Sequence, residues 1–136
     1  MNLLKIFQVT GSGLFAQKVR LNIAATNIAN SQVTRTLEGG PYKAKVVILK
    51  AIPLSEKDPN LKVVKVEKIV DDPSPFKEVY DPGHPDADER GIVKYPNVDV
   101  ITEMVELLSA GRAYEANLTV LSTTKSMTLK TLDLLR

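Results

Sequence analysis

The chain has 136 residues, the size of one domain, and 43% of them are hydrophobic and 25% charged, as in ordinary globular proteins. The net charge of +2 and the 5% share of aromatic residues do not favour a nucleic-acid-binding protein, which needs a basic surface and aromatic residues for stacking. Cysteine is absent and His84 is the single histidine, so disulfides, thiolate catalysis and histidine-rich metal sites are excluded.

The N-terminus, MNLLKIFQVTGSG, is not expected to be a secretory signal, because Lys5 and Gln8 interrupt its apolar stretch and no cleavage pattern follows. No run of the chain reaches the roughly 18 apolar residues that span a bilayer. These two features predict a cytoplasmic protein with no direct membrane insertion, or a protein that is exported without a cleaved signal.

Residues 1–36 are predicted to form one long helix, because hydrophobic residues recur at alternating steps of four and three. Gly11 and Lys18 interrupt the series. The helix is expected to end in the segment AATNIANSQ (24–32), where asparagine, a poor helix former, occurs twice. The predicted contact positions of this helix are Leu4, Phe7, Leu14, Leu21, Ala25 and Ile28.

Residues 37–95 are expected to form a small antiparallel β insertion. Two longer stretches and two short ones have the β-branched character of half-exposed strands: 42–52, 61–71, 79–80 and 92–93. Proline, glycine and aspartate mark the turns, at 39–41, 58–60, 72–75 and 81–85. Residues 51–66 offer only their composition as a guide.

Residues 96–136 are predicted to form a second helix that begins at Pro96 and Asn97 and repeats the four-three stepping, with Gly111, Lys125 and Thr128 as exceptions. A helix of this length measures roughly 60 Å, about twice the diameter of a compact domain, so it is expected to protrude and to need a partner along its length. Its predicted contact positions are Val100, Met104, Leu107, Tyr114, Asn117, Leu118, Leu121, Leu132 and Leu135.

The order helix, insertion, helix predicts an α+β fold in which the terminal helices pair as an antiparallel coiled coil, with the β unit at one end. Charge supports this pairing, because residues 1–37 contain no acidic residue and the first half of the second helix is mostly acidic. Lys18 and Arg20 would then lie near Glu106 and Glu115. Exposed ion pairs of this kind contribute only about 0.2–1 kcal/mol each, so they set register and partner choice more than stability.

Three short motifs allow a chemical interpretation, and each is better explained as structure. Residues 11–16 (GSGLFA) fit the dinucleotide pattern G-x-G-x-x-A, but no second strand ending in an acidic residue follows. Residues 86–91 (DADERG) begin like a calcium loop, but its twelfth position is Asn97 instead of a bidentate glutamate. His84 lies near aspartates in a proline-glycine turn, with no suitably placed nucleophile. The sequence therefore predicts no enzyme, cofactor or metal site.

The hydrophobic stripes of the two helices have two interpretations. They can pack against each other around a small core, or they can pack mostly against other subunits. A two-helix hairpin with a small sheet leaves much of both stripes uncovered, and isolated helices are marginal in water. The stripes therefore favour assembly into a larger structure.

The segment LNIAATNIANSQVTR (21–35) resembles the N-terminal signature of flagellar rod, hook and hook-associated proteins, a small-residue pair followed by A/S-x-N-hydrophobic-A-N. Further blocks, at 38–49, 71–93, 96–117 and 124–132, are similar in order to those of a proximal rod component of this family. The resemblance covers nearly the whole chain. One departure is Gly111, where the family pattern has serine.

The resemblance implies a structural, non-enzymatic subunit of the bacterial flagellar basal-body rod. Members of the family polymerise helically through their inner terminal helices into a drive shaft between the membrane ring and the hook, with a β-rich outer part. Their implied location is the periplasm-spanning rod, reached through the flagellar type III export apparatus without a cleaved signal peptide. The implied partners are other copies of the chain, neighbouring proximal and distal rod subunits, the rod–membrane-ring adaptor and the export apparatus.

A cytoplasmic coiled-coil adaptor or chaperone that forms a discrete oligomer is the competing hypothesis. For the rod interpretation, the two asparagines of AATNIANSQ have different expected roles. Asn30 suits a left-handed helix C-terminus. Asn27, next to Ile28, is expected to hydrogen-bond to a neighbouring subunit and fix register, so Asn27→Leu should spare export but impair assembly.

Overall fold

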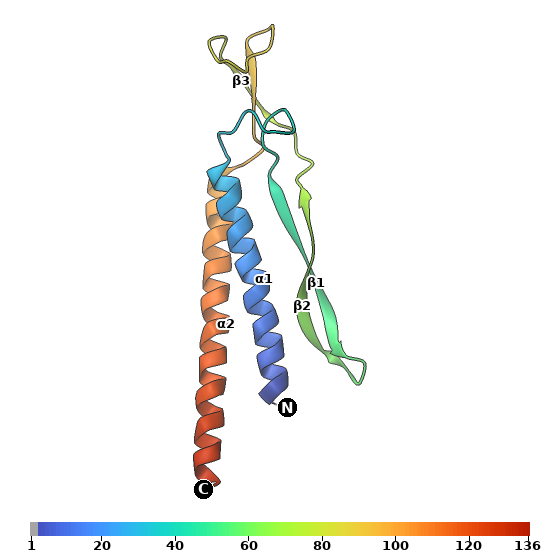
Figure 1. The fold of residues 1–136 in the computed structure, drawn as a ribbon, viewed down its shortest axis with the longest axis vertical. Coiled ribbons are helices and arrows are strands. Elements are labelled where there is room, and N and C mark those ends of the chain that lie inside the picture. Colours follow the sequence, from blue (N-terminus) through green and yellow to red (C-terminus); the bar gives the residue numbers. More distant parts are fainter. Residues whose placement is uncertain (1–2) are drawn as a thin grey trace.

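The computed structural model describes residues 3–136 and shows an elongated molecule with two long helices side by side and two separate β-hairpins (Figure 1). This arrangement confirms the predicted α+β fold with helices at both ends of the chain and antiparallel strands between them. The elements in chain order are α1 (Leu3–Ala29), β1 (Lys45–Ser55), β2 (Asp58–Asp71), β3 (Lys77–Tyr80), β4 (Ile92–Tyr95) and α2 (Val100–Leu134).

The two helices run antiparallel, and α2 extends past the N-terminal end of α1 (Figure 1). With 35 residues, α2 is about 52 Å long. It begins after Asp99, whose side chain accepts a hydrogen bond from the Ile101 N–H at 3.1 Å, a standard N-cap. The helix therefore starts slightly later than the predicted Pro96–Asn97.

The end of α1 at Ala29 does not use a left-handed residue. Within residues 3–136 positive φ angles occur only at glycines, so the expected left-handed conformation of Asn30 is wrong. Asn30 instead stays close to helical geometry, and both its backbone N–H and its side-chain amide donate to the Thr26 carbonyl, at 3.0 and 2.8 Å. The Thr26 carbonyl therefore accepts two hydrogen bonds from the same residue at the end of the helix.

Strands β1 and β2 form a long twisted ribbon that lies along α1 instead of at the end of the helix pair (Figure 1). Their register runs from Lys45 opposite Asp71 to Ser55 opposite Asp58. Residues 51–66 are thus paired strand and hairpin tip, and the predicted turn at 58–60 is wrong because β2 begins at Asp58. Pro53 is tolerated in β1 beside a register irregularity.

Three contacts fasten the ribbon to α1 at different points along its length. Near the C-terminal end of α1, the Asn27 side chain forms hydrogen bonds with the backbone of Lys45. Further along, the Ser12 hydroxyl accepts a hydrogen bond from the Val64 N–H at 3.1 Å. Close to the ribbon tip, Lys5 forms an ion pair with Asp58.

The second hairpin, β3–β4, forms a small head at the end of the molecule opposite both termini (Figure 1). Its four residue pairs confirm the two short strands expected around 79–80 and 92–93. Gly91, with φ of 76°, closes the loop between them, and a Cβ there would lie 3.0 Å from the Tyr80 ring. The position therefore needs glycine for both conformation and space.

The buried hydrophobic core is small and made mostly of small side chains. Its members are Ala16, Ala24, Ala44, Val93, Val98 and Ala110. Many larger side chains stay exposed along the helices, so the single chain leaves apolar surface in water along both of them.

Replacing Gly111 with alanine is expected to increase the helix content of the isolated chain. A Cβ at this position would lie 3.9 Å from the Leu21 Cδ2, an ordinary contact, so alanine fits without strain. Alanine is favoured over glycine within a helix by up to about 1 kcal/mol. Far-UV circular dichroism of both chains checks this, and a lower signal in the variant would contradict it.

Candidate functional site: an assembly surface

One face of α2 packs against α1, and within residues 3–136 α2 contacts no other helix or strand. The covered positions recur three and four residues apart, as in a coiled coil. Ala110 and Thr124 are buried, and Leu107, Tyr114, Asn117 and Leu121 are half-buried. The close approach of the helices depends on small residues, because a Cβ on Gly13 would lie 3.0 Å from the Asn117 Oδ1.

The predicted contact positions divide into two groups. Half-buried or buried positions are Phe7, Leu14, Leu21, Asn27, Ile28, Asn30, Val100, Leu107, Tyr114, Asn117 and Leu121. Exposed positions are Leu4, Ala25, Met104, Leu118, Leu132 and Leu135. The hydrophobic stepping did not identify Ala110 and Thr124, because the centre of the helix contact is occupied by small and polar residues. Ala110 and Thr124 each lie three residues after a predicted contact position, Leu107 or Leu121. This spacing could have identified them as further contact positions.

Asn27 lies inside the chain and not on a surface that another subunit could reach, with 1% of its area exposed. Its Nδ2 donates to the Lys45 carbonyl at 2.9 Å, and its Oδ1 accepts from the Lys45 N–H and the Tyr42 hydroxyl, both at 2.9 Å. Burial raises the pKa of Tyr42, which keeps the phenol protonated as a donor. The expected inter-subunit bond of Asn27 is therefore wrong: the amide ties α1 to β1 of the same chain.

A second asparagine, Asn97, holds the base of the head, whereas the sequence predicted for it only a place at the start of the second helix. Its Oδ1 accepts from the Ala44 N–H at 2.8 Å, and its Nδ2 donates to the carbonyls of Asp72 and Ser74 at 3.1 and 2.9 Å. It thereby joins the segments before β1, after β2 and before α2. No local pattern could have shown this, because all three partners are backbone groups distant in sequence.

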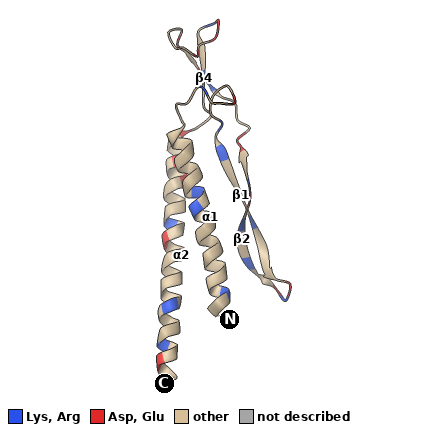
Figure 2. Ribbon diagram, in the orientation of Figure 1, with Lys and Arg blue, Asp and Glu red and all other residues tan. Residues whose placement is uncertain are grey.

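Charged residues are spread along both helices and the ribbon (Figure 2), and one predicted charge pair is present. The Arg20 guanidinium lies 2.5 Å from the Glu106 carboxylate and also donates to Gln17. No ion pair joins Lys18 to Glu115 in the described part of the chain, residues 3–136. The Arg20–Glu106 pair confirms the antiparallel register of the helices at this level.

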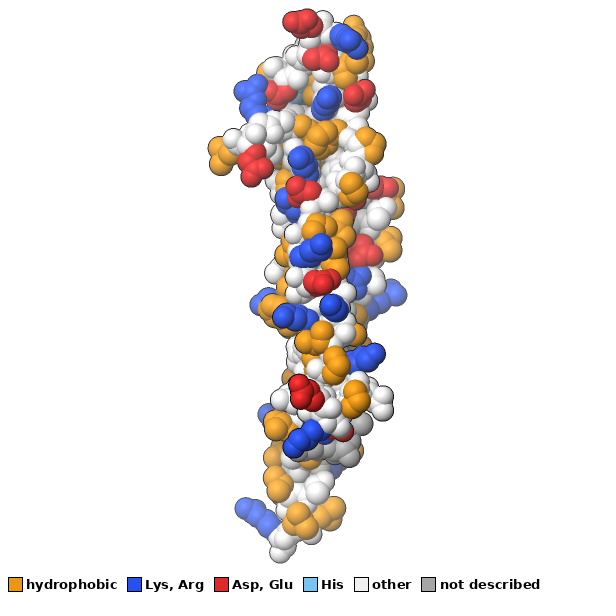
Figure 3. All heavy atoms as spheres, turned by 90° about the vertical axis from the view of Figure 1, so that its right-hand side faces the viewer, with side chains coloured by type: hydrophobic (Ala, Val, Ile, Leu, Met, Phe, Trp, Pro, Cys, Tyr) orange, Lys and Arg blue, Asp and Glu red, His pale blue; other side chains and the backbone are white. Residues whose placement is uncertain are grey.

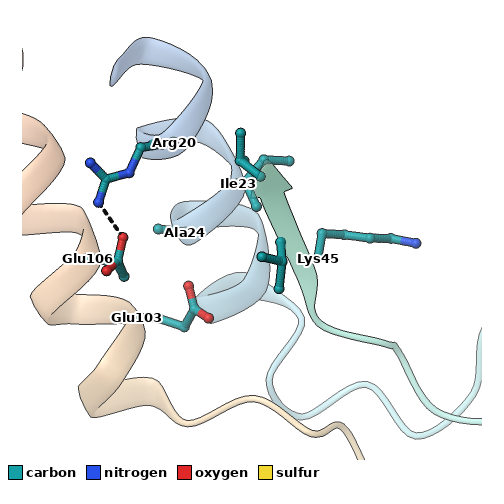
Figure 4. Close-up of a pocket in the computed structure, with 8 residues that line it drawn as sticks. Arg20, Ile23, Ala24, Lys45, Glu103 and Glu106 are labelled. Atoms are coloured by element: carbon teal, nitrogen blue, oxygen red, sulfur yellow. Dashed lines mark hydrogen bonds and ion pairs between the residues drawn. The ribbon is translucent and has the colours of Figure 1, made fainter. Parts of the chain in front are cut away.

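A groove of about 350 Å³ opens beside this pair, between α1, α2 and the start of β1 (Figure 4). The Glu103 side chain points into it, next to Ala24, while Lys45 points away. Burial raises the pKa of Glu103, and the neighbouring carboxylate of Glu106 adds to this shift. The groove is therefore lined by a carboxylate whose charged form is disfavoured.

Replacing Glu103 with glutamine is expected to strengthen helix pairing at neutral pH. Because the folded-state pKa of Glu103 is raised above 4.5, its contribution favours the folded state in acid and is lost as the pH rises through that pKa. Glutamine keeps the acceptor oxygen without the charge. Far-UV circular dichroism against pH should show helix content falling less above pH 4.5 in the variant than in the parent; identical profiles would contradict this.

The three chemical motifs have structural roles. The GSGLFA segment lies within α1, without the preceding strand that dinucleotide binding requires. Asp86 pairs with Arg35 and accepts from the Thr34 hydroxyl at 2.8 Å, and the pKa of Asp86 is lowered by these contacts. His84 accepts a hydrogen bond from the Asp86 N–H and packs edge-on against Tyr95.

No group of three or more histidine, cysteine or acidic side chains within residues 3–136 could hold a metal ion. Neither helix of the described chain is long and apolar enough to cross a membrane.

Comparison with known proteins gives consistent similarities. Residues 89–134 match the family described as flagellar basal body rod FlgEFG protein C-terminal. The chain is 47% identical over 134 residues to flagellar basal-body rod protein FlgC of Yersinia enterocolitica and 48% identical over 136 residues to that of Salmonella typhimurium, covering 98% of each chain. It is 38% identical over 151 residues to that of Borreliella burgdorferi, covering all of this chain and 99% of the relative.

Proposed function

The chain belongs to the family of flagellar basal-body rod proteins FlgC, and from this premise we propose that it polymerises through its terminal helices into the proximal part of the rod. As a member of that family it is a structural component of the rod, located in the basal body, and not an enzyme. The rod would act as a drive shaft that carries torque from the membrane ring to the hook. Its partners there would be further copies of the chain and other rod subunits.

The observation that carries this proposal is the uncovered outer face of α2. Ile101, Val105 and Leu108 are 74%, 60% and 62% exposed, on the side of the helix away from α1. Exposed apolar residues continue toward the C-terminal end, at Leu118, Met127, Leu129 and Leu132. Since no other element of residues 3–136 covers them, packing of α2 against neighbouring subunits would bury this surface.

Location and export follow from the same premise. A chain that forms the rod must reach the space between the membranes. We therefore propose export through the flagellar type III apparatus, with the rod–membrane-ring adaptor and the neighbouring proximal and distal rod subunits as the proteins it meets on assembly.

Deletion of the chain, followed by electron microscopy of basal bodies, tests the function. Cells without it are expected to lack complete rods and to be non-motile, with both restored by the full chain supplied in trans. Normal rods and swimming after deletion would refute the proposal. A discrete oligomer confined to the cytosolic fraction would instead support a coiled-coil adaptor.

The isolated monomer is expected to have largely unfolded terminal segments that become ordered on assembly. The small alanine-rich core and the exposed stripes support this, because isolated helices are marginal without tertiary contacts. Hydrogen exchange on a verified monomer checks it. Strong protection at both Leu21 and Leu121 would show that the helices are already stable and would contradict the expectation.

A further inference from the structure

The β1–β2 ribbon carries a cluster of lysines on one face. Lys65 lies directly opposite Lys50. The register shift between Ile48 and Leu49 inserts one extra residue into β2, so Lys68 falls on the same face as Lys65. Like charges directly opposite each other destabilise an antiparallel pair. This lysine face, formed by Lys50, Lys65 and Lys68, therefore gains stability from an acidic partner.

The chain itself supplies little of that charge. Lys50 forms a long ion pair with Glu67, with 3.7 Å between the Lys50 Nζ and the Glu67 Oε1. No carboxylate of residues 3–136 forms an ion pair with Lys65 or Lys68. All three lysines are exposed, and Val46 on the same face is 41% exposed. The face thus offers apolar area beside uncompensated positive charge.

The head of the molecule has the complementary chemistry. The loop 81–91, between β3 and β4, contains four acidic residues and one basic residue, Arg90. Asp86 is used within the chain, but Glu89, shortly before β4, is exposed and forms no ion pair in the described residues. Tyr80, at the start of the loop, is 74% exposed and provides an apolar contact. Figure 3 shows that the face carrying the head presents acidic side chains together with basic ones.

The two surfaces cannot meet within one molecule. Strands β3 and β4 of the head contact neither β1 nor β2 among the described residues, and the head lies at the end of the molecule while the ribbon extends toward the opposite end. A contact between them therefore needs two copies. Such a head-to-side contact is heterologous, so it can repeat from copy to copy, as a helical assembly requires.

We propose that the acidic loop 81–91 of one copy docks on the lysine face of a second copy. The inference rests on the proposed rod function and names the surfaces that join neighbouring copies outside the helices. Opposite charge brings the copies together in the correct register, and Tyr80 and Val46 supply apolar area at the contact.

Disulfide cross-linking tests the contact, because the chain contains no cysteine. Lys65→Cys and Glu89→Cys are placed on separate full-length chains and produced together in the bacterium that makes the protein. Basal bodies isolated without reductant are expected to contain a disulfide-linked dimer of the two chains, which is absent when either variant is produced alone. A matched control pairs Glu89→Cys with Lys130→Cys, on the exposed surface of α2, and is expected to give no dimer.

Charge reversal provides a second readout. Lys65→Glu and Glu89→Lys are each expected to lower the number of assembled rods about two- to fivefold, and the double variant is expected to restore it. Basal bodies that hold both cysteine chains without a dimer would overturn this inference and leave the rod function intact. A disulfide to a different protein would also overturn it, since the partner would not be a second copy. Absence of the chain from basal bodies would overturn the rod function, and this inference with it.

Discussion

Asn27→Leu is expected to abolish swimming while export of the chain continues. Leucine leaves the Lys45 N–H and carbonyl and the Tyr42 hydroxyl without their partner. Each buried polar group left unsatisfied costs about 1–3 kcal/mol, a large share of the stability of a domain this size. The ribbon should then separate from the upper part of α1. Swimming assays measure motility, electron microscopy of basal bodies measures rod assembly, and immunoblotting of the exported chain measures export.

Asn22→Leu is the matched control, because Asn22 is on the same helix and is exposed. It makes the same chemical change without removing a buried hydrogen bond, so it should leave swimming close to that of the parent. Swimming that is normal in Asn27→Leu, or equally lost in both variants, would contradict the role of Asn27 as the tie between α1 and β1.

Gly13→Leu is expected to impair rod assembly by forcing the two helices apart. A Cβ at Gly13 would already lie 3.0 Å from the Asn117 Oδ1 and 3.3 Å from its Cγ, and leucine adds three further carbons. Overpacking of this kind costs about 1–3 kcal/mol, which exceeds the gain of up to about 1 kcal/mol from removing a helical glycine. The number of complete rods seen by electron microscopy should fall strongly.

The neighbouring glycine provides the comparison. A Cβ on Gly11 would have no heavy atom within 4 Å, so Gly11→Leu gains helix propensity without a clash in the chain. Far-UV circular dichroism should show more helix in Gly11→Leu than in Gly13→Leu. Equal helix content in the two variants would argue against a tight helix crossing at Gly13.

The helices could be predicted because their signal is long and repeated. Hydrophobic stepping could be followed along helices of 27 and 35 residues, and the class of fold followed from it. The ribbon was harder to define. Asp58, Pro59 and Asn60 have turn composition but lie in β2, while the actual hairpin tip contains Glu56 and Lys57. An edge strand tolerates proline, so composition alone misplaced the turn.

The residues of the candidate site were predicted only where the signal was hydrophobic or charged. Arg20 and Glu106 could be paired because opposite charge and antiparallel order both pointed to them. Asn27 was singled out correctly but given the wrong partner, because a side-chain amide bonds whichever backbone group the fold brings near it. The placement of the ribbon along α1, which decides that partner, depends on contacts between segments distant in sequence.

The fastening of the ribbon along α1 has a mechanical consequence. Asn27, Ser12 and Lys5 attach it at well-separated points, so α1 and the ribbon resist sliding past each other when the molecule bends. Elongated elements that cannot slide past each other bend together as one thicker beam. The bending stiffness of such a beam rises much faster than the number of elements in it. In a subunit of the flagellar rod, the ribbon thus works as a brace that adds flexural rigidity to the helix pair using only 27 residues of chain from β1 to the end of β2.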